Sequence, residues 1–186
     1  NDQKTLLLQA QKDVDAFVKV MDDTAKKVEA LAGDVQKRAS GLDAIKSQAA
    51  SVAQKIKSFS AYLDRIKDAI SSAQSTISSG TTAVAFGAAL SKVADAEKLK
   101  ATITTEKAND LVPALDALTK TALPNFTKSF GDLPADIAGD IQKQVAWVGA
   151  VDTSVNAFMD TIATLKTQLA SKRDQLSQDD LRVFGD

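Results

Sequence analysis

The chain has 186 residues, of which 44% are apolar and 25% charged, and its 23 basic and 24 acidic side chains leave a net charge of −1. This length suffices for one folded domain, and the scattered basic residues form no face of the kind that binds nucleic acid. The absence of cysteine and histidine excludes disulfides, thiolate and histidine metal sites, and a Ser-His-Asp triad.

The N-terminal part of the chain carries two apolar rows with heptad spacing, interrupted by Thr24 and Arg38. The first row is Leu7, Val14, Met21, Val28, Val35, Leu42, Ala49, Ile56, Leu63, Ile70 and Ile77, and the second is Ala10, Phe17, Leu31, Ile45, Val52, Phe59, Ile66 and Ala73. This a/d pattern is typical of helices that pack as coiled coils. The heptad register continues across Gly33 and the Ser40-Gly41 pair, but because these helix-disfavouring residues cluster we expect helices over residues 2–32 and 42–78, with one long helix as the alternative.

An uncharged window follows from Ala69 to Ser91. Its serine- and threonine-rich part, Ser71–Thr82, predicts a helix end and a turn, and Ala83 begins a helix over residues 83–107. The window is as long as the roughly 20 residues that span a bilayer, but its first half is too polar for a transmembrane helix. We expect a turn and a buried helix, and the alternative is an apolar ligand cavity or a membrane-inserting tip.

Two shorter elements come next. Asn109 or Asp110 can cap a helix over residues 110–123, with Pro113 in its first turn. Residues 124–131 begin with proline and end with glycine, so we expect an irregular connector there.

The last expected helix covers residues 133–176. Its apolar positions recur every seventh residue: Ile141, Val148, Val155, Ile162, Leu169 and Leu176. The stripe is widened by Ile137, Val145, Phe158, Met159 and Leu165. This pattern predicts a helix packed along its whole length, and no segment alternates as a strand would.

Few residues offer chemistry. Asp136 and Asp140 lie one helical turn apart and could form half of a cation site, but acidic residues also favour a helix N-terminus, which is the interpretation we prefer. Trp147 lies at the edge of the last apolar stripe, where we expect a packing residue, the alternative being a ligand contact. Asn125-Phe126-Thr127 is an N-glycosylation sequon, compatible with secretion. We therefore expect no metal, no cofactor and no enzyme activity.

Part of the chain, roughly residues 45–125, resembles a fungal family. The residues that carry the resemblance are Ile77–Val84, Ala88–Ser91, Asp95-Ala96 and the leucine-spaced Leu111–Leu118. They are similar to the middle of the hydrophobic-surface-binding protein A family, which includes cell-wall mannoproteins with helical lipid-binding domains. The resemblance implies a secreted helical bundle that binds fatty acids or hydrophobic surfaces.

Together these observations predict an all-α protein, an antiparallel bundle of four to five helices in a single domain over residues 1–186. We expect a non-enzymatic, secreted or cell-surface protein that binds a lipid, a fatty acid or a hydrophobic surface, and no nucleic acid. Apolar burial alone would hold an acyl chain, at about 0.8 kcal/mol per methylene. The candidate lining residues are Phe86, Leu90, Leu115, Phe126, Trp147 and Phe158. The alternatives are a membrane-interacting protein similar in outline to helical pore-forming toxins, and a structural coiled-coil interaction module.

Overall fold

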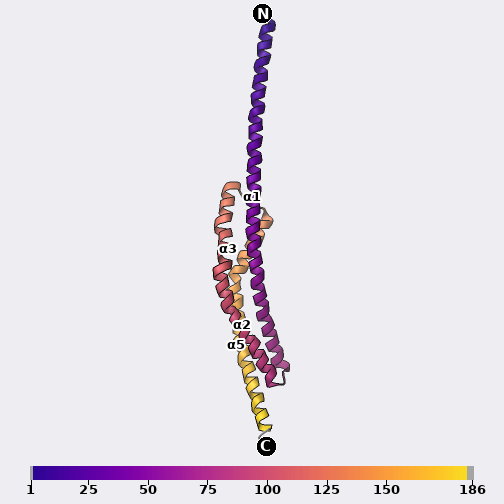
Figure 1. Cartoon of the computed structure of the whole chain (residues 1–186), viewed down its shortest axis with the longest axis vertical. Helices are drawn as coiled ribbons and strands as arrows, with labels where there is room; N and C mark the ends of the chain where they lie inside the picture. Colours follow the sequence, from indigo (N-terminus) through magenta and orange to yellow (C-terminus); the bar gives the residue numbers. More distant parts are fainter. Residues whose placement is uncertain (1, 184–186) are drawn as a thin grey trace. The chain divides into compact units, whose positions relative to one another are not determined.

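The computed structural model describes the backbone of residues 2–183 and the side chains of residues 2–178. Over this range the chain is all-α and has no strand. Three long helical stretches follow one another, separated by short turns (Figure 1). The expectation of four to five helices is therefore wrong, although the all-α class is confirmed.

The first stretch is a single helix, α1 (Asp2–Ser79), of 78 residues. The predicted break between residues 32 and 42 is absent, and Gly33 and Gly41 both lie inside the helix. Each glycine costs only about 1 kcal/mol in a helix interior, and the surrounding residues are mostly good helix formers. The unbroken heptad register across these glycines was therefore the better guide.

A tight turn at residues 80–82 joins α1 to α2 (Ala83–Glu106). The Gly80 amide donates to the carbonyl of Thr76 at 2.7 Å, which closes the end of α1. Thr82 caps α2, because its hydroxyl accepts from the Ala85 amide at 3.2 Å. The turn predicted inside Ser71–Thr82 is thus present, but only at its C-terminal end.

The second stretch continues without a break through η1 (Lys107–Leu111), α3 (Val112–Asp116), η2 (Ala117–Ala122) and α4 (Leu123–Phe130). The two η segments are π-helical turns. The Val112 amide donates to the Lys107 carbonyl and the Leu123 amide donates to the Leu118 carbonyl, five residues back in each case.

Each π-turn ends just before a proline, Pro113 or Pro124. A proline lacks the amide hydrogen and clashes with the carbonyl four residues back in a regular α-helix, and the wider turn accommodates both effects. The predicted boundary at 107–110 and the irregular connector at 124–131 are therefore wrong, since residues 123–130 are helical.

The third stretch is α5 (Ala135–Val183), which extends beyond the predicted end at residue 176. It follows Gly131, whose φ of +80° lies in the region that favours glycine and which ends α4. The heptad residues Ile141, Val148, Val155, Ile162 and Leu169 are all buried, which confirms the packed face as far as Leu169. Leu176 is only half-buried and Val145 is exposed, so the prediction of packing along the whole length is wrong at these two positions.

The chain divides into two compact units, residues 1–45 and residues 46–186. In the second unit α2 packs along α5 (Figure 1). Residues 46–79 of α1 contribute Val52, Phe59, Ile66 and Ala73 to the buried apolar core. Each of the other helical segments of this unit also contributes at least one buried side chain, and no buried residue among those described is polar or charged.

Candidate interaction surface

The first unit carries an exposed apolar face. Every described side chain from residue 2 to residue 40 is exposed, so the heptad rows that are largely buried further along α1 face solvent here. We call the apolar a/d residues of this segment the N-terminal stripe: Leu7, Ala10, Val14, Phe17, Met21, Val28, Leu31 and Val35. Phe17 is 64% exposed and Leu31 is 65% exposed.

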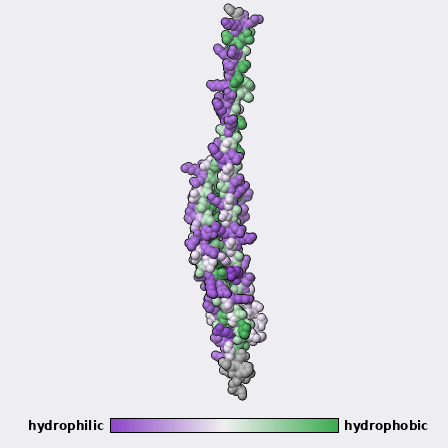
Figure 2. All heavy atoms as spheres, viewed as in Figure 1, coloured by the Kyte–Doolittle hydropathy of each residue, from purple (hydrophilic) through white to green (hydrophobic). Residues whose placement is uncertain are grey.

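This exposure is concentrated in one part of the chain. Thirteen large hydrophobic side chains are exposed among the described residues, and eleven of them lie between Leu6 and Val35. Figure 2 shows apolar side chains following one another along this part of α1. A contiguous apolar surface of this kind marks an interaction site, whereas isolated exposed apolar residues are normal.

The polar side chains around the stripe are also ordered. Lys12, Lys19 and Lys26 repeat every seventh residue on the face opposite the stripe. Asp13 and Lys27 instead occupy g positions, at the border of the stripe, and Asp13 accepts a hydrogen bond from the Gln9 amide at 2.9 Å. The stripe itself is therefore apolar, and two of the g positions along its border carry charges, as in coiled-coil interfaces.

The six residues predicted to line an apolar ligand site lie in the second unit and differ in burial. Phe86, Leu115 and Phe126 are buried at 1%, 8% and 4% exposure, while Leu90, Trp147 and Phe158 are half-buried. Trp147 packs edge-on against Phe59 with ring centroids 6.5 Å apart, which is the packing role expected for it.

Two of the six make other aromatic or cation contacts. Phe126 lies 5.3 Å from Phe130, between ring centroids, and the Lys67 ammonium lies 6.0 Å from the ring centroid of Phe158. Thus three of the six have identified aromatic or cation neighbours, each of which lies outside the predicted set.

Two surface hollows lie along α2. One, of about 300 Å³, is lined by Arg65, Asp68, Ala69, Lys92, Asp95, Ala96 and Leu99. The other, of about 410 Å³, is lined by Glu97, Lys100, Ala101, Thr104 and Thr105. Neither includes any of the six predicted lining residues, and both have charged borders that suit an acyl chain poorly.

The uncharged window around the α1–α2 turn is only partly buried. Phe86 and Ala89 face the core, whereas Val84 is 83% exposed. The expectation of a helix buried on all sides is therefore wrong for the start of α2. Among the described residues no helix is long and apolar enough to cross a bilayer.

The acidic pair at the start of α5 is exposed. Asp136 lies in the first helical turn, where the helix dipole favours an acid, and Asp140 pairs with Lys143 at 3.2 Å. Among the side chains of residues 2–178, no group of three or more acidic residues is placed to hold a metal ion.

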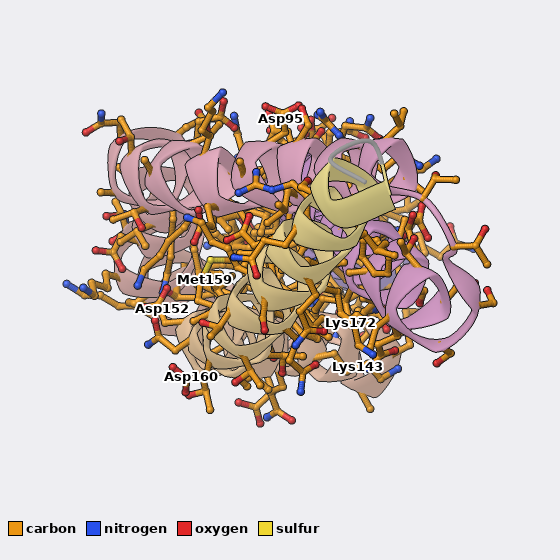
Figure 3. The ribbon with its side chains drawn as sticks, turned by 90° about the horizontal axis from the view of Figure 1, so that it is seen from below. Asp95, Lys143, Asp152, Met159, Asp160 and Lys172 are labelled. Carbon is orange, nitrogen blue, oxygen red and sulfur yellow. The ribbon has the colours of Figure 1, made fainter. Side chains whose placement is uncertain are left out.

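Figure 3 shows how side chains divide along α5: Met159 points between the helices, while its neighbour Asp160 points outward. Asp152 also lies at the surface and pairs with Lys107 at 2.7 Å. Asp152 and Asp140 are therefore both held in surface ion pairs of the ordinary structural kind.

No protein-family model matches the chain, and no curated protein or solved structure matches it either. The resemblance to the hydrophobic-surface-binding protein A family stays a prediction.

Proposed function

We propose that this protein is a non-enzymatic interaction module, whose N-terminal stripe docks an apolar helical partner in the manner of a coiled coil. The observation that carries the proposal is the exposure of the stripe together with its apolar neighbours, which makes eleven exposed large apolar side chains between Leu6 and Val35. A lone helix gains most of its stability from packing its apolar face, so a long helix with this face in water favours a partner.

In this proposal residues 46–186 serve as a scaffold, a bundle of three helical stretches in an up-down-up order. Ion pairs and hydrogen bonds support this order: Lys55 pairs with Asp110, Tyr62 with Glu106, and Lys92 with Ser72, so residue numbers run in opposite directions along α1 and the second stretch. The second stretch and α5 are likewise antiparallel, as two further ion pairs indicate: Lys107 with Asp152 and Lys166 with Glu97.

Amide hydrogen exchange on the full chain tests the docking role. A paired helix protects its amides, so we expect slow exchange in residues 2–40 of the parent protein. Phe17→Asp places a charge inside the stripe and should abolish the protection. Lys19→Asp introduces the same residue on the opposite face of the helix and should leave most of the amide protection in place. Equal behaviour of the two variants, or no protection in the parent, would count against the proposal.

A second candidate is binding to an apolar surface or lipid through the α1–α2 turn, and exposed Val84 within the uncharged window favours it. Co-sedimentation with phosphatidylcholine vesicles tests it: binding should fall for Val84→Asp and not for Val145→Asp, a matched change on α5. A secreted or cell-surface location is part of this candidate. Failure of the parent protein to sediment with vesicles would exclude it.

A further inference from the structure

We infer that the partner of the N-terminal stripe is the same stripe of a second copy of this chain, with the two helices antiparallel about a twofold axis near residue 19. This inference rests on the proposed function and adds the partner, the direction and the register. A twofold interface is self-complementary: if residue i of one copy meets residue j of the other, then j meets i. Each residue of the stripe should therefore have a compatible partner elsewhere in the same stripe.

Antiparallel heptad helices form layers in which an a residue of one chain lies beside a d residue of the other. Centring the pair near residue 19 places Phe17 beside Met21 of the second copy, Leu7 beside Leu31, and Ala10 beside Val28. Each contact occurs twice, and the three kinds of layer are entirely apolar. Methionine sulfur beside an aromatic ring, as in the central layers, is a favourable contact.

The fourth kind of layer pairs Val14 with Thr24 of the second copy. The Thr24 hydroxyl already donates to the Val20 carbonyl of its own helix at 2.7 Å, so it needs no partner across the interface. The apparent interruption of the heptad pattern at Thr24 therefore fits inside this interface.

The widest part of the apolar face falls at the proposed axis. Val18 and Val20, at the e and g positions, widen the stripe on both sides of Phe17 and Met21. In this register each of these valines lies beside its own counterpart in the second copy. The largest apolar cluster of the segment is thus buried at the centre of the interface, away from its ends.

The charges at the border fit the same register. In antiparallel pairs g residues face g residues, and here Asp13 faces Lys27 of the second copy, twice by symmetry. A shift by one heptad in one direction would place Asp13 opposite Asp34, and a shift in the other direction would shorten the overlap. Complementary charges at these positions set partner and orientation in coiled coils.

A parallel pair in register suits the sequence less well. It would place Arg38 opposite Arg38 in a core layer and Thr24 opposite Thr24. It would also leave Asp13 and Lys27 facing Val18 and Ala32, so neither charge would gain an opposite partner. The antiparallel register ends with Val35 beside Gln3 of the second copy, before Arg38, and so avoids the like-charged layer.

Distance measurements between spin labels on the full-length chain test this arrangement. The chain has no cysteine, so single labels can be placed at Asp22→Cys and Gln36→Cys, both away from the stripe. At a rise of 1.5 Å per residue, the antiparallel dimer separates the two labels at residue 36 by about 50 Å along the axis and those at residue 22 by about 9 Å. A parallel dimer gives a short distance for both.

A charge swap tests the register. Asp13→Lys and Lys27→Asp should each weaken the dimer about 3- to 10-fold in dissociation constant, measured by sedimentation equilibrium, because each turns two attractive contacts into repulsive ones. The double variant Asp13→Lys/Lys27→Asp should restore the parent value. Asp15→Lys makes the same change at a position outside the interface and should have little effect.

The outcomes separate this inference from the proposed function. A dimer with short distances at both labels, a trimer or tetramer, or a double variant that is not rescued would overturn the antiparallel pairing and leave the docking role in place. A monomer whose residues 2–40 exchange freely would overturn both.

Discussion

Tyr62 of α1 donates a hydrogen bond from its hydroxyl to the Glu106 carboxylate, and the two oxygen atoms lie 3.2 Å apart. The residues are 44 positions apart in the sequence, so this bond fixes the register between α1 and the end of α2. The hydrogen bond holds the phenol proton, and partial burial and the Glu106 charge act in the same direction, so the pKa of Tyr62 is raised above its ordinary value of 10.0.

This relationship can be measured directly, because Tyr62 is the only tyrosine. Ultraviolet titration should show the phenol ionising above pH 10.0, and Glu106→Gln should lower the pKa toward the ordinary value. Because the folded state holds this proton more tightly, the stabilisation from Tyr62 is fully present below pH 10.0 and is lost as the pH rises through the higher folded-state pKa. An unchanged pKa in Glu106→Gln would contradict the role of the hydrogen bond.

Two valines of α5 give a matched test of the core. Val155 is 3% exposed and Val145 is 44% exposed. Val155→Asp buries an unpaired charge and should cost about 3–5 kcal/mol of unfolding free energy, whereas Val145→Asp should change it by only about 0.5 kcal/mol. Urea denaturation followed by circular dichroism measures both. Similar midpoints for the two variants would mean that the assigned packing face of α5 is wrong.

Gly80 in the turn after α1 and Gly87 inside α2 give a second matched pair, in which replacement by alanine should change stability in opposite directions. A Cβ atom at Gly80 would lie 2.5 Å from the Thr76 carbonyl oxygen and 3.2 Å from the Phe86 ring. Gly80→Ala should therefore destabilise the protein by about 1–3 kcal/mol. At Gly87, inside α2, nothing lies within 4 Å of the added atom, so Gly87→Ala should stabilise by about 0.5–1 kcal/mol. Thermal melting of both variants checks the signs, and a stabilised Gly80→Ala would refute the close approach.

Two ion pairs of similar length should contribute differently to the free energy of unfolding, because their lysine side chains differ in burial. Lys107 is 16% exposed and pairs with Asp152 at 2.7 Å, whereas Lys98 is 78% exposed and pairs with Asp95 at 3.0 Å. Asp152→Asn removes the carboxylate paired with a mostly buried lysine side chain and should cost about 1 kcal/mol, while Asp95→Asn should cost close to nothing. Chemical denaturation at low and high salt measures the difference. Equal losses would show that burial of Lys107 adds nothing to its ion pair.

The heptad rows predicted the helices well because helical packing repeats every seven residues. The α5 row from Ile141 to Leu169 is buried throughout, and the row through Ile45, Val52, Phe59 and Ile66 is buried as well. Breaks were predicted poorly, because Gly33 is only mildly unfavourable in a helix and Pro113 is accommodated by a π-turn that no simple residue pattern reveals.

The sequence predicted only one of the two properties of the N-terminal stripe. The pattern from Leu7 to Val35 shows that a face is apolar, but exposure depends on whether the rest of the chain covers it, and that is a tertiary property. None of the six predicted ligand-lining residues borders either surface hollow, and the sequence pattern alone does not separate the two roles, because apolar side chains such as Phe86 and Leu115 serve a core as readily as a pocket.

The two π-turns also bear on how this chain can change its length. A turn closed by a bond to the fifth preceding residue contains one more residue than an ordinary α-helical turn. Deleting one residue from Lys107–Leu111 or from Ala117–Ala122 would convert that turn to the regular form and leave the side chains before and after it on their present faces, but only if the proline that follows is also replaced, because a regular turn brings its ring against the carbonyl four residues back. The same deletion within Asp136–Gln168 of α5 would rotate every later heptad residue by about 100° around the helix axis and remove it from the core. A single-residue deletion in either turn should accordingly be tolerated when Pro113 or Pro124 is replaced with it, whereas a deletion that keeps the proline should distort the helix.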